Sequence, residues 1–362
     1  MMISSMGRHM ISRRRALQAG AGALASLSFM PKGARAADEL NLLVWCDHTG
    51  AALLDPFAEK HGIKINTKEY DLPGVAYSIL EQSQPGDWDV FVADTGDIMS
   101  AVAKGYLGEL PDAEMPWADI FPELKQPDSH YKDGKLYAVP EKFGYNTIAF
   151  NNTKVSQEEA RQAKVMWDPK YAGRIAIYDY YIPTMEMVAI ALGIKPQEIT
   201  KMHLPAIKEK LVEMKKLSSL VGDVPTTQNA LVTGSADIIV GGGEFAVAGL
   251  MAEKPELDWV LPNEGGVRWS QSIGIFKEST KKDLAVEFVK YIVSPEGQGR
   301  LATADCYWAM PSNSKADLND EQKKRLRWDQ QPEFIAKSYP YFFGDAELDA
   351  AMQEVWTEVL GA

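Results

Sequence analysis

The sequence predicts an α/β protein built from two lobes, each a mixed sheet flanked by helices. Three observations support this prediction. Apolar runs of strand length alternate with segments of helical apolar spacing, and the connections between them are short. One hairpin signal interrupts this alternation, which then resumes as a second block. The chain is 46% hydrophobic, and the roughly 325 residues beyond its leader are enough to bury two cores.

The first block begins with an apolar run of strand length at residues 40–45. Helical apolar spacing follows over 51–61, where Gly62 offers a stop, and 63–67 alternates like a half-buried strand. The same criteria extend the block with a helix at 75–82, a strand at 88–92 and a helix at 97–104, ended by Gly105. Strands that are joined through helices in this way are typical of a parallel sheet.

The interruption is Asp133-Gly134, a two-residue hairpin signal, and an apolar strand over 147–150 follows it. A second block of alternating elements starts after Asn151. Its predicted strands are 175–178, 236–240, 259–262 and 272–276, and its predicted helices are 184–192, 206–220, 228–233 and 284–293. After the strand 236–240 come three consecutive glycines, which let the backbone approach a ligand or the opposite lobe closely.

Residues 1–36 have the order of regions found in a twin-arginine export signal. Arg13-Arg14-Arg15 precedes the mildly apolar run 19–30, and Ala34-Arg35-Ala36 has the small-x-small form of a signal-peptidase site. About a dozen weakly apolar residues cannot span a membrane, which needs roughly 20. A general secretory signal, or a helix of a cytoplasmic enzyme, is the alternative interpretation. We expect an exported, periplasmic protein with no membrane insertion.

The mature chain is strongly acidic. Six of the 38 basic residues and none of the 50 acidic residues lie in the leader, so 32 basic side chains face 50 acidic ones afterwards. This balance argues against nucleic acid and anionic lipid as partners and permits cationic small molecules. Cys46 and Cys306 are too few for a disulfide-built scaffold, and the sequence leaves open whether they form one bridge. A protein that is exported folded should not need that bridge to fold.

Five segments, taken in order, resemble one family: the solute-binding proteins of ATP-driven (ABC) importers, in the branch that contains the spermidine/putrescine receptors. They are 43–45 (LVW), 86–90 (GDWDV), 167–173 (WDPKYAG), 262–266 (PNEGG) and 285–289 (AVEFV). The resemblance extends over residues of about 40 to 360. It implies the two-lobed periplasmic-binding-protein fold, in which two α/β lobes joined by a two-strand hinge close on a ligand.

The resemblance also implies how the chain is divided. The two crossing strands are expected near 143–150 and 269–276, so that lobe 1 comprises 38–146 plus 273–315 and lobe 2 comprises 147–272 plus 316–362. A small-molecule ligand would lie in the cleft between the lobes, and the importer's permease would recognise the closed form. We expect no cofactor and a monomeric protein. A sensor that serves a membrane receptor would have the same fold.

Polyamine receptors hold ammonium groups with carboxylates and enclose the alkyl chain between aromatic rings, because a desolvated cation needs a countercharge or a π face. Position by position, the resemblance keeps two of the aromatic residues, Trp45 and Trp269. At the other positions Gly96 stands for a tyrosine, Tyr180 and Pro183 for two acids, Val240 for a tryptophan and Gln271 for an aspartate. Asp94 and Asp97 lie close to Gly96 in the sequence, and Asp179 and Glu244 are the carboxylates that can substitute for the missing acids.

Arg268 changes the expected ligand, because a guanidinium next to Trp269 can pair a carboxylate or phosphonate at two points. An exposed arginine on a strand edge is the alternative. Together with Asp94, Arg268 favours a ligand with both an amine and an acidic group, such as an ω-amino acid or an aminophosphonate; a polyamine such as putrescine or spermidine is the other candidate. The predicted ligand-binding residues are Trp45, Asp47, His48, Asp94, Thr95, Asp179, Tyr180, Tyr181, Glu244, Arg268, Trp269 and Gln271.

Two other functions compete with solute binding. His48 and the adjacent pair Tyr180-Tyr181, with Asp94, would make a hard, oxygen-rich site for ferric ion. An enzyme is less well supported, because the sequence has no G-x-S-x-G, no phosphate-binding P-loop and no G-x-G-x-x-G after a strand. We therefore expect a binding protein that is not an enzyme.

Overall fold

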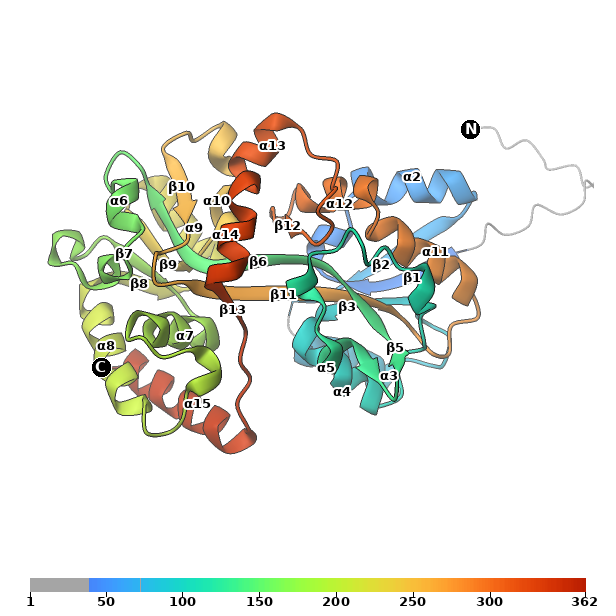
Figure 1. Cartoon of the computed structure of the whole chain (residues 1–362), viewed down its shortest axis with the longest axis horizontal. Coiled ribbons are helices and arrows are strands. Elements are labelled where there is room, and N and C mark those ends of the chain that lie inside the picture. The colour runs from blue at the N-terminus through green and yellow to red at the C-terminus, as the bar shows by residue number, and fades with distance from the viewer. Residues whose placement is uncertain (1–38, 72) are drawn as a thin grey trace, which may run out of the picture. The chain divides into compact units, whose positions relative to one another are not determined.

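The computed structural model describes residues 39–71 and 73–362, and Figure 1 shows how their helices and strands are arranged. The predicted export signal lies outside these residues. A sheet of eleven strands runs through the described part in the order β2-β1-β3-β11-β6-β9-β7-β8; β10 and β12 pair with β6, and β13 pairs with β11. The strands are β1 Glu39–Val44, β2 Lys64–Glu69, β3 Val90–Asp94, β6 Ala138–Asn151, β7 Ile175–Tyr178, β8 Ser218–Gly222, β9 Ile238–Gly242, β10 Leu257–Val260, β11 Gly266–Ile275, β12 Met310–Pro311 and β13 Ser338–Pro340.

Two long antiparallel strands, β6 and β11, lie side by side in the middle of this sheet (Figure 1). The C-terminal part of β11 pairs with β3, whereas the C-terminal part of β6 pairs with β9. Each strand therefore passes from one set of parallel strands to the other. We call the part around β1, β2 and β3 the first lobe and the part around β7, β8 and β9 the second lobe. The predicted crossing strand 143–150 lies within β6, and 269–276 overlaps β11 up to its last residue, Ile275.

The first lobe folds as the sequence pattern predicts. Along β1, Leu42 and Val44 enter the core on one face of the sheet, and Leu43 enters the core on the other. Burial of both faces is why this strand is an unbroken apolar run. The helices of this lobe are α2 Ala51–His61, α3 Pro73–Gln82, α4 Ile98–Ala103 and α5 Pro127–His130. The short hairpin of β4 (Tyr131–Lys132) and β5 (Lys135–Leu136) turns at Asp133 and Gly134, both with positive φ, as the Asp-Gly signal predicts.

Helix α2 contains Pro56 in its interior, which removes the hydrogen bond that would otherwise reach the carbonyl of Ala52. The guanidinium of Arg300, in α12 (Pro295–Ala302), donates to that carbonyl at 3.0 Å. An acceptor left free by the proline is thus satisfied by a residue 248 positions away. This bond ties α12 to the first lobe.

In the second lobe, β7 is flanked by β8 and β9, all parallel, and both of its faces are buried. Ile175 and Ile177 enter one core and Ala176 the other. The helices are α6 Gln157–Ala160, α7 Tyr181–Ala191, α8 Leu204–Leu217, α9 Val224–Thr233 and α10 Glu244–Val247. Helix α7 is buried along almost its whole length, so apart from Thr184 and Glu186 its buried residues are apolar on all sides rather than on one stripe.

The predicted helix 206–220 was wrong at its end. Helix α8 stops at Leu217, and residues Ser218–Gly222 form strand β8, which pairs with β7 in parallel. The sequence after Leu217 is Ser-Ser-Leu-Val-Gly, which has low helix propensity. The predicted strand 147–150 was too short, because β6 begins at Ala138 and is buried throughout its first thirteen residues.

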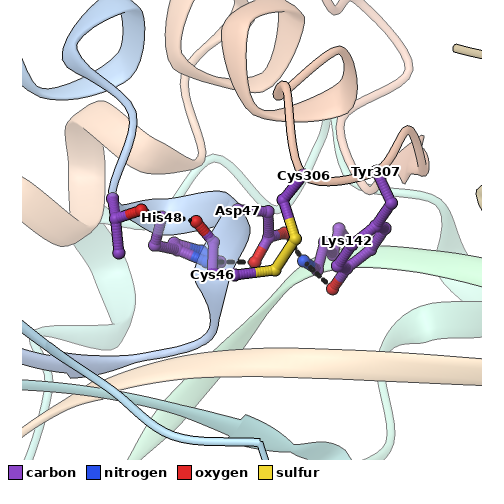
Figure 2. Close-up of a disulfide and its surroundings, with 7 residues drawn as sticks. Cys46, Asp47, His48, Lys142, Cys306 and Tyr307 are labelled. Atoms are coloured by element: carbon purple, nitrogen blue, oxygen red, sulfur yellow. Dashed lines mark hydrogen bonds and ion pairs between the residues drawn. A yellow bond between two sulfur atoms is a disulfide. The ribbon is translucent and has the colours of Figure 1, made fainter. Parts of the chain in front are cut away.

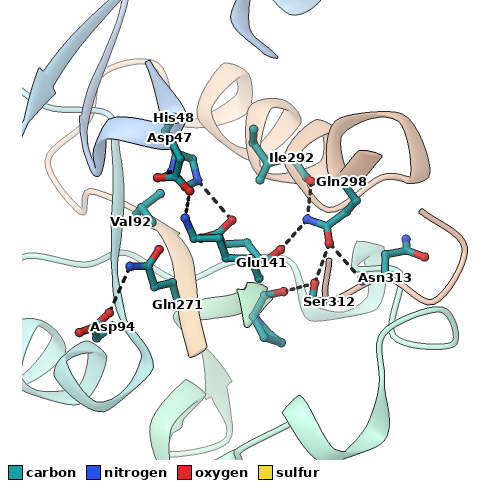
Figure 3. Close-up of polar contacts among 12 residues, drawn as sticks. Asp47, His48, Val92, Asp94, Glu141, Gln271, Ile292, Gln298, Ser312 and Asn313 are labelled. Atoms are coloured by element: carbon teal, nitrogen blue, oxygen red, sulfur yellow. Dashed lines mark hydrogen bonds and ion pairs between the residues drawn. The ribbon is translucent and has the colours of Figure 1, made fainter. Parts of the chain in front are cut away.

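The C-terminal part of the chain returns to both lobes after β11. Its helices are α11 Lys282–Ile292, α12 Pro295–Ala302, α13 Asp320–Arg325, α14 Gln331–Lys337 and α15 Ala346–Gly361. Buried Gln298 fastens α12 to β6: its Nε2 donates to the carbonyl of Glu141 at 2.6 Å, and its Oε1 accepts from Ser312 (Figure 3). Helix α15 lies against α8 in the second lobe, where Lys215 donates to the carbonyl of Leu360 and satisfies the end of that helix.

Candidate ligand-binding site

The candidate site is centred on Asp94, the last residue of β3, at the carboxyl edge of the first-lobe sheet. Gln271 of β11 stands opposite Asp94 in the sheet register, and its Nε2 donates to Asp94 Oδ1 at 3.2 Å (Figure 3). Burial, with the nearby charge of Asp97, raises the pKa of the Asp94 carboxyl to about 7, although the Gln271 bond acts in the opposite direction. Within the described residues, no lysine or arginine pairs with Asp94.

A series of aromatic rings runs between the lobes, and its four tyrosines lie close enough to Asp94 for its charge to act on them. We call them the aromatic series: Tyr307, Trp269, Phe245, Tyr178, Tyr180 and Tyr341, whose successive ring centroids are 6.0–6.4 Å apart. A separate pair, Trp45 and Tyr70, lies on the first lobe with centroids 4.6 Å apart. Burial is the main reason for a raised pKa in all five of these tyrosines, and the negative charge of Asp94 raises the pKa of each further: Tyr70, Tyr178, Tyr180, Tyr307 and Tyr341. One carboxylate therefore acts on rings of both lobes.

The space beside Asp94 explains why position 96 is a glycine. A Cβ at Gly96 would lie 2.6 Å from the ring of Phe343, which comes from the segment between β13 and α15. Phe343 is half exposed, and its ring is 6.1 Å from that of Tyr341. An aromatic residue from the C-terminal segment thus occupies the place beside position 96.

Glu244 is fully buried at the start of α10, and its carboxylate accepts from the backbone N–H of Tyr145 at 3.2 Å. Burial raises the pKa of Glu244 well above its ordinary value. Any side chain at Gly144 would collide with both this carboxylate and the indole of Trp269. Gly144 and Trp269 are paired in the β6–β11 register, so a glycine lets Trp269 and Glu244 pack against the middle of the two crossing strands.

Thr95 is held by a chain of hydroxyl groups on the first-lobe side. The Gln126 N–H donates to Nδ1 of His130, which leaves Nε2 of that ring to donate to Ser272 Oγ at 2.9 Å. The hydroxyl groups of Ser272 and Thr95 are 2.8 Å apart, and Ser270 Oγ donates to Thr95 Oγ1 at 2.9 Å. Burial lowers the pKa of His130 to about 4, so the ring is neutral at pH 7. This network fixes the turn that presents Asp94.

The proposed role of Arg268 in pairing a ligand carboxylate is not supported. Its guanidinium is buried and donates to the carbonyl of Ile335 at 3.0 Å and to Ser338 Oγ at 3.1 Å. Because side chains alternate along a strand, Arg268 lies on the opposite face of β11 from Trp269 and Gln271. The alternative of an exposed strand-edge arginine is also wrong. Arg268 anchors the C-terminal segment.

Two further predicted residues point away from Asp94. Asp179 is exposed and accepts from the indole N–H of Trp356 in α15 at 2.9 Å. The hydroxyl of Tyr181 donates to Asp349, also in α15. Tyr180, by contrast, lies in the aromatic series. A backbone turn at the start of α7 therefore separates the adjacent tyrosines, with one at the site and one on the second-lobe helices.

Asp47 and His48 belong to a buried ion cluster, which we define as Asp47, His48, Glu141 and Lys142. Figure 2 shows Asp47, His48 and Lys142, and Figure 3 shows Glu141. Lys142 is ion-paired with Asp47, and its Nζ donates to the hydroxyl of Tyr307 at 2.6 Å. The two ring nitrogens of His48 lie 3.0 Å from Asp47 Oδ1 and 3.2 Å from Glu141 Oε2. The cluster reaches the aromatic series through Tyr307, but its carboxylates are used within the protein.

This geometry does not favour the ferric-ion alternative. His48 is enclosed by two carboxylates of the cluster, Tyr181 is bonded to α15, and only Tyr180 and Asp94 remain at the site. Among residues 39–71 and 73–362, no group of three or more His, Cys, Asp or Glu side chains is arranged to hold a metal ion. The neighbouring cysteines are also used, because Cys46 and Cys306 form a disulfide with Cα atoms 6.1 Å apart (Figure 2).

Sequence reasoning missed most of the aromatic residues, Phe245 among them. Tyr178 ends strand β7 and Tyr70 follows β2, so both stand at strand ends where ligand residues gather, and that position was a usable signal. Tyr307 is the neighbour of Cys306, but that position points to the site only when the disulfide to Cys46 is known. Tyr341 and Phe343 lie in a C-terminal segment for which no element was predicted.

The comparisons with known proteins agree with this architecture. Residues 52–334 match the family of bacterial extracellular solute-binding proteins. Over 294 residues, the chain is 24% identical to spermidine/putrescine-binding periplasmic protein 1 of Haemophilus influenzae, which covers 80% of this chain and 79% of that protein. None of the helices in the described residues has the length and apolar composition needed to cross a bilayer.

Two solved structures illustrate the fold. The spermidine/putrescine ABC transporter substrate-binding protein of Streptococcus pneumoniae has a TM-score of 0.77 at 18% identity, covering 90% of this chain and 99% of that chain. The binding protein MotA of A. tumefaciens, in complex with glucopine, has a TM-score of 0.67 at 19% identity, covering 88% and 99%. These likenesses confirm the predicted two-lobed periplasmic-binding-protein fold. The family match covers well over half of the sequence, and the chain therefore belongs to the bacterial extracellular solute-binding protein family.

Proposed function

We propose that this protein is the substrate-binding component of an ABC importer and that it captures a polyamine, such as putrescine or spermidine, at the site around Asp94. The observation that carries this proposal is the half-buried Asp94 carboxylate, which sits among aromatic rings of both lobes. An ammonium group would supply its countercharge, and the rings would supply π faces to the cation and apolar contacts to the alkyl chain.

Two features support a polyamine over an amino-acid-like ligand. Arg268, the arginine that would pair an acidic group of the ligand, instead donates hydrogen bonds to the carbonyl of Ile335 and to Ser338 Oγ. The buried Oε1 of Gln271 has no hydrogen-bond partner among the described residues, so an acceptor as well as a carboxylate is available beside Asp94. Relatives whose names mention spermidine and putrescine point the same way.

The remaining parts of the proposal follow from the family. A periplasmic receptor of this kind is exported, here by the twin-arginine signal inferred for residues 1–36, and delivers its ligand as a monomer to a membrane permease. Lobes spanning 38–146 plus 273–315 and 147–272 plus 316–362 would close about β6 and β11. In this proposal the protein binds and releases its ligand without changing it chemically, and it is not an enzyme.

A thermal-shift screen tests the proposal. Purified protein is heated with putrescine, spermidine, 4-aminobutyrate, an aminophosphonate, ferric citrate or glucose. A ligand at a hundredfold excess over Kd adds about 2.7 kcal/mol to the unfolding free energy, which is a clear shift. We expect shifts with the two polyamines and none with glucose or ferric citrate. A shift with 4-aminobutyrate alone would replace the polyamine by an amino acid, and a shift with glucose alone would refute an amine ligand.

A further inference from the structure

The Cys46–Cys306 disulfide joins two segments that each carry an aromatic residue of the site. Cys46 lies directly after Trp45, at the end of β1, and Cys306 lies directly before Tyr307, between α12 and β12. The two cysteines are 260 positions apart in the sequence. Figure 2 shows the disulfide beside Tyr307 and Lys142.

Both rings belong to the surroundings of Asp94. Trp45 packs on Tyr70 and Tyr307 packs on Trp269, and the charge of Asp94 adds to burial in raising the pKa of both Tyr70 and Tyr307. The disulfide therefore links the segment of Trp45, which follows β1, to the segment of Tyr307 in the C-terminal part. Each ring is the sequence neighbour of one of the two cysteines.

The segment that carries Tyr307 is attached at Trp308, which packs against the core that contains Trp259 and lies under the guanidinium of Arg325. Residues 304–309 lie outside any helix or strand, and the backbone bonds that close the segment are those from Ala304 to Leu301 and from Ala309 to Ala302. Tyr307 itself packs on Trp269, and the disulfide and the hydrogen bond from Lys142 join it to the first lobe. Lys142 is itself paired with Asp47, the neighbour of Cys46, so both attachments lead back to the same turn after β1.

The Cys46–Cys306 disulfide can be reached by a reductant in solution. Cys306 is an exposed residue, whereas Cys46 is only partly accessible. A dithiol reductant attacks the accessible sulfur, forms a mixed disulfide, and then closes to its own cyclic disulfide. The reductant loses two electrons and two protons in this exchange, and Cys46 and Cys306 become thiols. The core residues of both lobes take no part in this bond.

We propose that the Cys46–Cys306 disulfide is a redox-sensitive positioning element, which keeps Trp45 and Tyr307 in place around the cation and whose reduction weakens ligand binding while the fold persists. The inference rests on the proposed function, since it concerns affinity at the same site. Loss of one or two ring contacts to a cation predicts a rise in Kd of about tenfold or more.

The test compares putrescine binding by titration calorimetry for the oxidised protein, the protein reduced with dithiothreitol, and the variant Cys46→Ser/Cys306→Ser. We expect the weaker Kd in the last two, each with a single cooperative thermal transition. Met214→Ala is the matched control, because it removes a fully buried side chain from the second-lobe core and lowers stability far from this segment. Its Kd should stay within about twofold of the oxidised protein.

Hydrogen–deuterium exchange supplies a readout that needs no ligand. Reduction should speed exchange in residues 304–309 and leave β7 and β9 unchanged. Equal Kd values in the oxidised and reduced states would overturn the proposal, and so would unchanged exchange in 304–309. Failure of the oxidised protein to bind any amine would instead overturn the proposed function, and the exchange result alone would then decide whether the disulfide holds this segment.

Discussion

Two carboxylates that follow first-lobe strands, Asp47 after β1 and Asp94 at the end of β3, are treated in opposite ways by this protein. Asp47 is fully buried but ion-paired with Lys142 and in contact with His48. Asp94 is less buried, and its partners among the described residues are the amide of Gln271 and a surround of aromatic rings.

The two carboxylates differ in whether the protein supplies a countercharge. A buried charge is stable when the protein supplies its countercharge, and removal of one partner leaves the other stranded. A carboxylate that receives no countercharge from the chain has its pKa raised, as for Asp94, until a cation arrives. The first arrangement satisfies its charges within the protein, and the second is the one that the proposed function assigns to a ligand.

The largest effect should come from breaking the first arrangement. Asp47→Asn removes the ion-pair partner of Lys142, a buried amine whose pKa burial already lowers well below its ordinary value, and we expect the unfolding free energy to fall by about 3–5 kcal/mol. Urea denaturation measures this loss. The double variant Asp47→Asn/Lys142→Met removes both charges and should recover most of it. A loss below about 0.5 kcal/mol, as for an ordinary surface change, would show that the cluster is not structural.

Asp94→Asn tests the second arrangement and should act on affinity instead. Loss of a desolvated partner for an ammonium group predicts putrescine binding weaker by about 2–4 kcal/mol, measured by calorimetry. The ligand-free variant should be at least as stable as the wild type at pH 8, because a desolvated charge has been removed. Asp97→Asn is the matched control and should have a smaller effect. Wild-type affinity in Asp94→Asn would remove Asp94 from the site.

Ligand affinity and the stability of the ligand-free protein should change in opposite directions as the pH rises. The folded pKa of Asp94 is about 7, above its ordinary value of 3.8, so stability of the ligand-free protein from this group falls as pH rises between those values. Affinity for a cation rises over the same window, approaching tenfold per pH unit below 7 (about 1.4 kcal/mol), and levels off above it. Asp94→Asn should flatten the affinity profile between pH 5.5 and 8; a flat wild-type profile would contradict this assignment.

The smallest expected effect on binding is that of Arg268→Met. Its hydrogen bonds to Ile335 and Ser338 are lost, so stability should fall by about 1–2 kcal/mol, while putrescine affinity changes by less than about twofold. Chemical denaturation and calorimetry on the same sample separate the two. A variant that loses 4-aminobutyrate binding would restore Arg268 as a carboxylate partner.

Sequence patterns predicted the fold well because its elements obey local rules. Buried parallel strands such as β1 and β7 read as apolar runs, and Gly62 ends α2 in the left-handed conformation that a glycine stop requires. Errors arose where tertiary pairing decides the structure: β8 exists because it pairs with β7, and the length of β6 follows from its passage between lobes.

The site was harder to predict than the fold. The sequence singled out Trp45, Asp94, Tyr180, Trp269 and Gln271 because each follows or lies on a strand edge, and the structure pairs Asp94 with Gln271 and places Tyr180 and Trp269 in the aromatic series. Their role as ligand-binding residues stays a prediction. The roles of charged residues were not predictable, because Asp47 and Arg268 meet partners 95 and 67 positions or more away in the sequence. Whether a charged side chain is paired or hydrogen-bonded inside the protein depends on such distant partners.

A carbon-detected NMR titration of the Asp94 carboxyl, with and without putrescine, tests the central claim most directly. If Asp94 is the countercharge that the ligand completes, its pKa should be near 7 in the free protein and fall by two or more pH units when putrescine binds. The signal is assigned by its absence in Asp94→Asn. A pKa of the ordinary aspartate value in the free protein, or one that putrescine leaves unchanged, would contradict the account.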